Sequence, residues 1–287
     1  MECDVLFLGF GPITHAFAKK LTSQGHKVIV VSDRSVAVEN KVVFPTNSFQ
    51  KISWSDALKL EIKSQSTYIC WRQSPKNRIL GPELVNWVKS TNVRTQKIHH
   101  LSSASVYKGD QAIFSEGDYD SRTSGTNLNS KQALEELVFE ISKVKQSTFV
   151  NYRISNVYGA GIISGFISES MKNLANNEPI MIYRKLDLIR DYLFIDDLVG
   201  ALFDLRLHEY QDEVLNISTG HGVAISEVIN LLKLSTAKDL SFIETEAPIG
   251  ILPRSVLSCK KLKETITWKP ERLDTTIDRL LIRGPSV

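Results

Sequence analysis

Two stretches of the sequence carry side chains that could act on a bound ligand. Residues 100–107 form an apolar strand that runs into a cluster of hydroxyl groups, among them Ser103 and Ser105. Further along, a helix opens with Lys131 near its start. A hydroxyl donates and accepts hydrogen bonds, whereas an ammonium group only donates them. Asn127, just before the lysine, also donates and accepts, but it does not exchange a proton near neutral pH.

A glycine turn near the start of the chain is the second candidate for chemistry. An apolar run at 4–8 predicts one buried strand, and Gly9, Gly11 and Pro12 follow it where a helical pattern begins. Pro12 suits a first helical position because its missing N–H would be unpaired there. The next strand is predicted at 27–32, which has Val-Ile-Val-Val at its centre. Strand, glycine turn, helix and strand in this order are typical of a dinucleotide-binding segment.

The glycines let the backbone approach a pyrophosphate, whose charge would rest on the helix N-terminus at Pro12 and Ile13. The usual third glycine is replaced by Thr14, which should loosen the contact between helix and strand. A plain turn with two glycines stays open as the alternative.

The end of the second strand bears on the choice of coenzyme. Aligned by the glycines, the usual acid position of dinucleotide-binding segments falls on Ser32, with Asp33 and Arg34 just beyond it. An acid at this point would bind the ribose hydroxyls of NAD, whereas an arginine would accept the 2′-phosphate of NADP. Both coenzymes stay open, with Arg34 favouring NADP. The alternative is that Asp33 and Arg34 are a solvated strand end.

These residues must be positioned by strands that alternate with helices, which predicts an α/β fold with a doubly wound parallel sheet of the Rossmann type. Residues 1–155 are expected to form this dinucleotide-binding domain, and 156–287 a smaller C-terminal substrate-binding lobe with some segments returning to the sheet. A helix is expected at 54–62 with Ser53 as its cap. Further strands are expected at 41–44, 67–71, 97–102 and 147–154, and further helices at 82–88, 129–144 and 225–232.

Ser103 and Lys131, with their spacing, resemble the catalytic centre of the extended short-chain dehydrogenase/reductase family, the NAD(P)-dependent epimerases, dehydratases and reductases of nucleotide sugars. That family has Tyr-x-x-x-Lys after the hydroxyl residue, and here Asn127 stands at the tyrosine position. The resemblance runs nearly from end to end. Residues 153–159 are similar to the family's Arg-x-x-Asn-x-Tyr-Gly, and residues 190–198 to its Arg-Asp-Phe/Tyr-x-x-Val-Asp-Asp. Residues 214–220 match the family's strand and glycine turn, and residues 253–270 resemble the C-terminal end of the deoxysugar 4-ketoreductases.

The resemblance implies roles for these residues. Ser103 and Ser105 would orient a sugar oxygen, and Lys131 would bind the coenzyme ribose. The family tyrosine passes a proton to or from the sugar, and losing such a group typically costs ~100- to 10,000-fold in rate. Tyr119 in the polar loop at 109–126 is a candidate substitute acid. Tyr107 is a second candidate, although the family commonly packs a tyrosine there, and a carboxylate or phosphate of the substrate is a third.

Substrate recognition is also implied by the resemblance. Asn156 would meet the nucleotide sugar, while Arg190 and Arg254 would bind its diphosphate through charge-assisted hydrogen bonds. An alternative for Arg190, compatible with the first, is a salt bridge to Asp196 or Asp197.

Two functions from different classes follow. The first is an NAD(P)-dependent enzyme that reduces or epimerises a nucleotide-linked keto sugar. Dehydration is disfavoured because Ala104 and Ser105 stand where the family's dehydratases have Asp-Glu. The second is a degenerate relative that binds dinucleotide or nucleotide sugar as a sensor, regulator or partner subunit. A methyltransferase built on the same glycine turn is a weaker third, because it has no use for Ser103 and Lys131.

Composition excludes other classes. A hydrophobic content of 42%, a charged content of 23% and a net charge of +3 indicate a globular protein and give no reason to expect nucleic acid or membrane as a partner. The three cysteines are far apart and lack metal-ligand spacing, so we expect a reduced, cytoplasmic protein without a metal site. A homodimer stays open, but the short helix at 82–88 counts against it.

Overall fold

The computed structural model describes residues 1–33, 37–38, 42–43, 49–70, 93–119, 130–184, 187–209, 211–236, 240–248 and 250–283. The chain divides into two compact units. The sheet unit comprises Met1–Val106, Tyr119–Arg153 and Leu202–Leu215. The second unit comprises Tyr107–Asp118, Ile154–Ala201 and Asn216–Val287.

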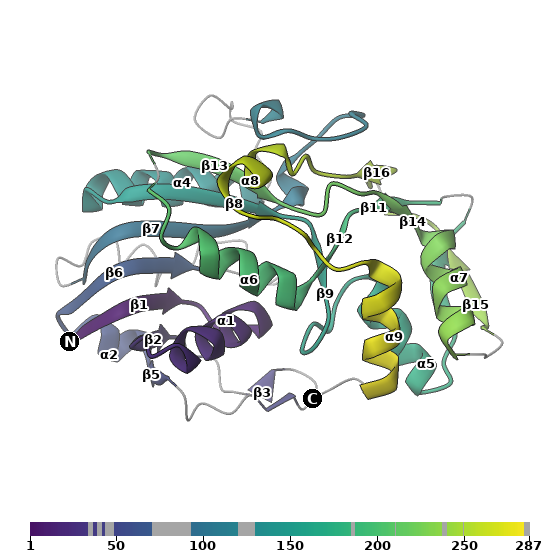
Figure 1. Ribbon diagram of the computed structural model, residues 1–287, viewed down its shortest axis with the longest axis horizontal. Helices are drawn as coiled ribbons and strands as arrows, with labels where there is room; N and C mark the ends of the chain where they lie inside the picture. The colour runs from purple at the N-terminus through teal and green to yellow at the C-terminus, as the bar shows by residue number, and fades with distance from the viewer. Residues whose placement is uncertain are drawn as a thin grey trace. The chain divides into compact units, whose positions relative to one another are not determined.

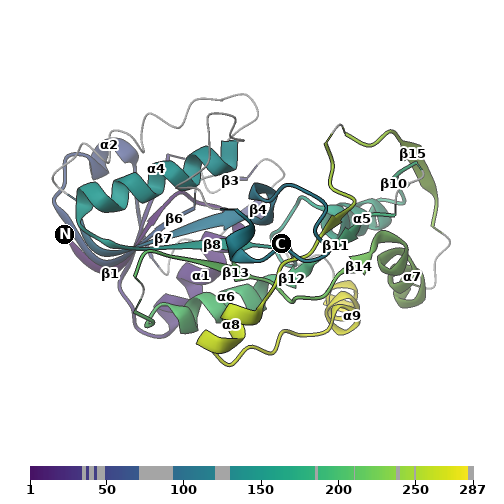
Figure 2. The ribbon, with the colours of Figure 1, turned by 90° about the horizontal axis from the view of Figure 1, so that it is seen from above.

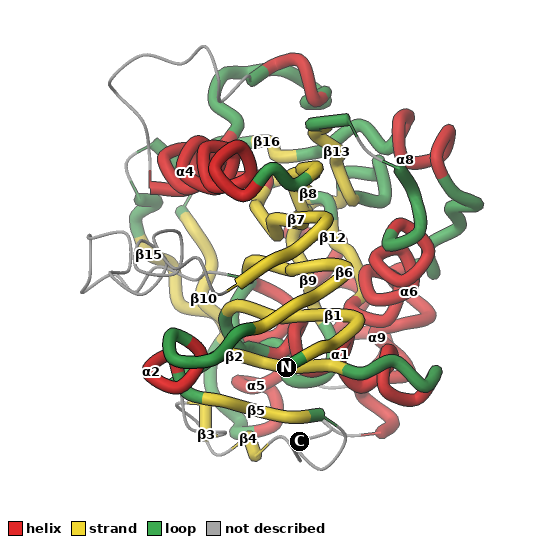
Figure 3. The backbone as a smooth tube through the Cα atoms, turned by 90° about the vertical axis from the view of Figure 1, so that its left-hand side faces the viewer, coloured by secondary structure: helices red, strands yellow, loops and turns green. Residues whose placement is uncertain are grey.

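A seven-stranded sheet organises the sheet unit, with strand order β13-β8-β7-β6-β1-β2-β5 (Figures 1 and 3). The pairs whose register is described, such as β1 with β6 and β6 with β7, are parallel. This is the Rossmann-like α/β fold that the alternating pattern predicts. The strands are β1 Glu2–Leu8, β2 Val28–Val31, β5 Gln50–Ile52, β6 Ile62–Ile69, β7 Val93–Ser103, β8 Thr148–Ile154 and β13 Glu213–Ile217.

Helices cover both faces of this sheet, which explains why its central strands are apolar on both sides. The helices α2 (Trp54–Ala57) and α4 (Ser130–Lys145) lie over one face and α1 (Pro12–Ser23) over the other (Figure 2). Along β1, Leu6 and Leu8 belong to the core under α4, while Phe7 between them packs on Phe17 of α1. The side chains therefore alternate between the two faces along the strand.

The helix α4 forms where its apolar period predicts. Leu134, Val138 and Ile141 recur at helical spacing and are buried in the core cluster, as expected. The structure also confirms the strands expected at 4–8, 27–32, 97–102 and 147–154, the helix expected at 225–232 and the Ser53 cap, whose hydroxyl accepts from the Asp56 N–H at 3.0 Å.

The strand expected at 41–44 is present at Val42–Val43 but lies outside the seven-stranded sheet, and the helix expected at 54–62 is too long. Val42–Val43 (β4) pairs antiparallel with Ala37–Val38 (β3) rather than extending the sheet, and β5 takes the place beside β2. As an edge strand with polar residues, β5 carries little apolar signal. The helix expected at 54–62 ends at Ala57, because Ile62 already begins β6, where buried and exposed residues alternate with the period of a strand. The helix expected at 82–88 lies outside the described residues.

The second unit is built from short strands and helices. The strand β9 (Asn156–Tyr158) pairs parallel with β12 (Tyr192–Phe194), which follows β11 (Ile189–Arg190) in the sequence. In a separate sheet, β11 lies between β14 (Val223–Ala224) and β16 (Arg254–Ser255). A third pair joins β10 (Ile180–Tyr183) to β15 (Phe242–Thr245). The helices are α5 Phe166–Ala175, α6 Ile195–Leu205, which continues into the sheet unit, α7 Ile225–Thr236, α8 Lys260–Thr265 and α9 Leu273–Arg283. Within the described residues, no helix combines the length and the apolar character needed to cross a bilayer.

Candidate active site

The turn between β1 and α1 requires glycine at one of its two glycine positions. Gly9 has φ +101°, and a Cβ there would lie 2.6 Å from the carbonyl oxygen of Cys70. Gly11 is extended, with φ −170°, and a Cβ would meet no atom within 4 Å. Pro12 then opens α1, and no side chain caps the helix. The uncapped first turn and the open space at Gly11 fit the approach of a phosphate group.

Thr14 is buried at the position of the usual third glycine. It lies in the first turns of α1, beside the thiol of Cys70 at the end of β6. Burial raises the pKa of the Cys70 thiol to about 12, with the neighbouring Thr14 hydroxyl acting in the opposite sense. The Cys70 thiol is therefore uncharged at physiological pH.

The acid after β2 has a defined partner. Oδ1 of Asp33 accepts a hydrogen bond from the backbone N–H of Trp54 at 2.9 Å, at the first residue of α2. Ser32 is buried, and its N–H donates to the Ile52 carbonyl at 3.0 Å. Asp33 is exposed, and one of its oxygens is held at the start of α2, where a negative charge is favourable. Arg34 lies outside the described residues.

The predicted hydroxyl cluster forms at the carboxyl end of β7. Ser103 is half-buried, and its Oγ accepts from the Ser105 hydroxyl at 3.2 Å and from the Ser105 N–H at 3.3 Å. Ser105 itself is exposed, on the short 3₁₀ turn Ala104–Val106. Lys131 is half-buried in the first turn of α4. Asn127 lies outside the described residues.

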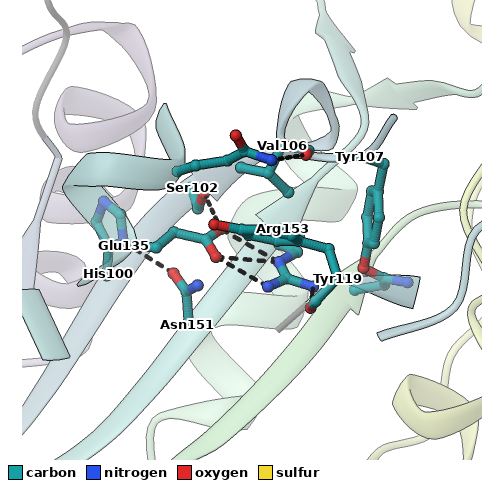
Figure 4. Close-up of polar contacts among 10 residues, drawn as sticks. His100, Ser102, Val106, Tyr107, Tyr119, Glu135, Asn151 and Arg153 are labelled. Carbon is teal, nitrogen blue, oxygen red and sulfur yellow. Dashed lines mark hydrogen bonds and ion pairs between the residues drawn. The ribbon is translucent and has the colours of Figure 1, made fainter. Parts of the chain in front are cut away.

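Beneath these residues lies a buried polar cluster that the sequence analysis missed (Figure 4). Glu135 and Arg153 form an ion pair with both side chains fully buried, Oε2 to Nη2 being 2.9 Å. Oε1 of Glu135 also accepts from the Ser102 hydroxyl at 2.5 Å. We refer to Ser102, Glu135 and Arg153 as the buried triad. One feature of the sequence could have indicated the triad. Glu135 stands next to Leu134 and three residues before Val138, so the helical period places this acid on the side of α4 that faces the core.

His100 lies next to the triad on the same side of β7. Its Nδ1 is hydrogen-bonded to Oδ1 of Asn151 at 2.8 Å, and the ring is buried. Burial lowers the pKa of His100 to about 4; the charge of Glu135 raises it, and those of Lys131 and Arg153 lower it. The imidazole is therefore neutral at physiological pH. Lys131 is near enough for its charge to act on this ring.

The two tyrosines that could replace the family's acid have structural partners. Tyr107, in the second unit, is buried, and its hydroxyl donates to Oδ1 of Asn216 at 2.7 Å, which agrees with the packed alternative. Tyr119, in the sheet unit, accepts a hydrogen bond at its carbonyl from Nη1 of Arg153 at 2.9 Å. The Arg153 guanidinium also lies 5.0 Å from the centre of the Tyr119 ring.

In the second unit, Asn156 is exposed at the start of β9. Its side-chain Nδ2 and its backbone N–H both donate to the carbonyl of Asp191, at 3.2 and 3.0 Å. The buried Asp191 carboxylate accepts from the N–H groups of Thr219 and Gly220, at 3.0 and 2.9 Å. Asp191 therefore connects the turn after β13 to the segment that carries Asn156.

Arg190 and Arg254 both contact backbone carbonyls. Arg190 donates to the carbonyls of Ile189 and Leu252 at 2.8 Å, and burial lowers its pKa. The expected salt bridge from Arg190 to Asp196 or Asp197 is wrong: within the described part of the chain, Arg190 forms no ion pair with either. Nε of Arg254 donates to the Ala112 carbonyl at 2.7 Å. A guanidinium has five N–H donors, so both arginines retain donors beyond these bonds.

The described residues contain no group of three or more His, Cys, Asp or Glu side chains that could hold a metal ion. The parallel sheet and the turn at Gly9 define a Rossmann-type α/β protein. The chain belongs to the NAD dependent epimerase/dehydratase family, whose model matches residues 73–218.

Curated relatives agree with this assignment. The chain is 28% identical to dTDP-4-dehydro-6-deoxyglucose reductase of Escherichia coli over 198 residues, which cover 63% of this chain and 58% of the reductase. It is 24% identical to CDP-abequose synthase of Salmonella typhimurium over 65% of this chain and 66% of that protein. The matches thus span between about half and two thirds of the length of the curated relatives.

A solved structure confirms the fold over almost the whole chain. UDP-glucose 4-epimerase of Thermotoga maritima, solved with UDP-glucose, superposes with a TM-score of 0.79 at 21% identity, covering 97% of this chain and 96% of the epimerase.

Proposed function

We propose that the protein is an NAD-dependent oxidoreductase that reduces or epimerises a keto sugar linked to a nucleotide. The observation that carries the proposal is the placement of Ser103 at the carboxyl end of β7 and Lys131 in the first turn of α4, in a family of such enzymes. The similar E. coli reductase and T. maritima epimerase both act on nucleotide sugars, as their names state.

The coenzyme would be held by the glycine turn and by Asp33. Gly9 gives the turn its left-handed backbone, and Gly11 leaves room for the pyrophosphate at the uncapped N-terminus of α1, with Pro12 and Ile13 in the first turn. The Asp33 carboxylate would bind the adenosine ribose, which supports NAD over NADP. When bound, the nicotinamide supplies or accepts hydride. Lys131 would bind the nicotinamide ribose through its ammonium group.

The substrate would be bound by hydroxyl, amide and guanidinium groups. Ser103 and Ser105 would hydrogen-bond the reacting sugar oxygen, Asn156 the sugar, and Arg190 and Arg254 the diphosphate. Asn127 removes the family's proton donor, so Tyr119 or an acidic group of the substrate would move the proton. We therefore expect slow turnover, about 100- to 10,000-fold below that of an enzyme with the tyrosine.

The second candidate function is a coenzyme- or nucleotide-sugar-binding protein without turnover, and Asn127 is the observation that favours it. Mixing the pure protein with NADH and observing the fluorescence of the nicotinamide tests binding. Turnover is then measured with dTDP-4-dehydro-6-deoxyglucose and with UDP-glucose.

Asn127→Tyr separates the two functions. If the natural chain binds NADH without turnover and Asn127→Tyr gains activity, the chain is a disabled oxidoreductase that serves as a binding protein. If the natural chain turns over and Tyr119→Phe abolishes the reaction, the enzyme with a displaced acid is supported. Absence of NADH binding would contradict the enzyme and also a coenzyme-binding role.

A further inference from the structure

The buried triad links the two elements that carry Ser103 and Lys131. Ser102 lies on β7 immediately before Ser103, and its hydroxyl donates to Glu135 of α4 at 2.5 Å. Glu135 follows Lys131 by four residues, which places the two side chains one helical turn apart on the same face of α4. A shift of the Glu135 carboxylate against Ser102 would therefore change the distance between Ser103 and Lys131.

Arg153 completes the arrangement from the neighbouring strand β8. Its Nε and Nη2 both donate to the Glu135 carboxylate, at 3.2 and 2.9 Å, so the carboxylate is held in a fork geometry. Its remaining terminal nitrogen donates to the Tyr119 carbonyl. A guanidinium with bonds to two segments has little freedom to turn, which fixes the position of the carboxylate.

Stability alone does not explain a fully buried ion pair in this place. Removing two charges from water costs about as much as their attraction returns, and apolar replacements of similar volume are often as stable or more so. In some proteins a buried pair selects one relative position of the elements that it joins, because a position that separates the charges leaves them unpaired. In this chain, those elements are β7, β8 and α4.

We propose that Ser102, Glu135 and Arg153 are positioning residues that set the distance between the Ser103 hydroxyl and the Lys131 ammonium group. The proposal depends on the proposed function, because it assigns Ser103 and Lys131 to the bound coenzyme and sugar. The triad itself stays buried and touches neither.

The experiment compares Ser102→Ala and Glu135→Gln with a matched control, Tyr152→Phe. Tyr152 is buried on β8 next to Arg153, and its hydroxyl is hydrogen-bonded to Nδ1 of His99 at 3.1 Å, so the control also loses one buried hydrogen bond. For each variant, kcat, KM, the Kd for NADH and the melting temperature are measured. If Glu135→Gln does not fold, the pair Glu135→Leu with Arg153→Met replaces it and leaves no unpaired charge.

We expect Ser102→Ala and Glu135→Gln to lower kcat at least 10-fold or to weaken NADH binding at least 10-fold. We expect Tyr152→Phe to change kcat and the Kd for NADH by less than about 2-fold, although its melting temperature falls as much as that of the triad variants. Glu135→Asp should recover part of the lost activity. Variants of the triad that lose only thermal stability, as the control does, would overturn the proposal.

A second readout does not need activity. Reductive methylation with ¹³C labels the lysines, and Lys131→Arg identifies the signal of Lys131 by its disappearance. The proposal expects Ser102→Ala to shift this signal and Tyr152→Phe to leave it in place. If the natural protein does not bind NADH, the proposed function fails; if it binds NADH and the signal stays unchanged in Ser102→Ala, the positioning role fails.

Discussion

The Asp33 carboxylate accepts the backbone N–H of Trp54 at 2.9 Å, so one oxygen of this acid is fixed at the start of α2. The contact holds the carboxylate at the end of β2, the position at which dinucleotide-binding folds recognise the adenosine ribose. A negative charge held there would favour ribose hydroxyls over a 2′-phosphate, and this relationship leads to the first prediction.

Asp33→Asn should weaken NADH binding by about 10-fold and strengthen NADPH binding. The amide keeps an oxygen for the Trp54 N–H but loses the charge that assists the hydrogen bonds to ribose. Fluorescence titrations with the two reduced coenzymes measure the change. Asp56→Asn, which alters another carboxylate at the start of α2, is the control. A variant that binds both coenzymes as the natural chain does would show that Asp33 is not the ribose ligand.

Gly9→Ala and Gly11→Ala should separate folding from coenzyme binding. At Gly9 the left-handed backbone costs an alanine about 1–2 kcal/mol, and the added Cβ would meet the Cys70 carbonyl at 2.6 Å. We therefore expect its free energy of unfolding to fall by about 2 kcal/mol or more in urea titrations.

At Gly11 the backbone is extended and the space is open, so unfolding should change by less than about 0.5 kcal/mol. The new methyl group would nevertheless occupy the space through which a pyrophosphate approaches, and NADH binding should be lost. Unchanged NADH binding in Gly11→Ala would place the coenzyme elsewhere.

The stability of the protein should fall in mild acid because of His100. The folded state holds the pKa of His100 near 4, whereas the unfolded chain has the usual value of 6.5. Between these values the unfolded state binds more protons, so the contribution of this group is fully present above pH 6.5 and is lost as the pH falls towards 4. The loss from this group would be about 3 kcal/mol.

Urea titrations at a series of pH values measure this slope in the natural protein and in His100→Gln, which should flatten it. His99, also buried, has its pKa lowered to about 3 by burial and by the charge of Lys97, so part of the slope should remain. His221→Gln, at an exposed position, is the control. An equal slope in His100→Gln and the natural protein would contradict the buried environment of this ring.

Arg190→Ala should mainly lower the stability of the protein, whereas Arg254→Ala should mainly weaken substrate binding. Arg190 donates to three carbonyls, of Ile189, Leu252 and Pro253, and losing these bonds should lower the free energy of unfolding by about 1–3 kcal/mol.

Within the described part of the chain, Arg254 makes one such bond. Its loss should therefore mainly raise KM for the nucleotide sugar, by about 10-fold or more, if it binds the diphosphate. UDP competition and urea titrations distinguish the two effects. The exposed Arg272→Ala serves as the control. An unchanged KM in Arg254→Ala would remove this residue from the substrate site.

The sequence predicts the centre of the sheet well and its edge poorly. The strands β1 and β2 are buried on both faces, and their continuous apolar runs are easily recognised. The edge strand β5 is polar, and Ile62, whose spacing of four from Leu58 fits one face of a helix, is the first residue of β6. Short edge strands are stabilised by hydrogen bonds to a neighbouring strand, and the local pattern of apolar residues does not show this pairing.

For the candidate site, motifs locate the ligand-facing residues and leave out their support. Ser103 and Lys131 were found from residue types and spacing. The pairing of Glu135 with Arg153 was missed because it joins α4 to β8, and only folding brings the two side chains together. Similarly, Arg190 donates to the carbonyls of Leu252 and Pro253 in a distant segment, and backbone groups have no signature in a sequence.

The place of β13 beside β8 also has a consequence for biosynthesis. The strand β13 (Glu213–Ile217) forms one edge of the seven-stranded sheet. Two segments of the second unit, Tyr107–Asp118 and Ile154–Ala201, are translated before it. The sheet can therefore be completed only after β13 has emerged from the ribosome. Until then, the nascent chain has an unpaired β8 edge, which is a site where chaperones or neighbouring chains could bind.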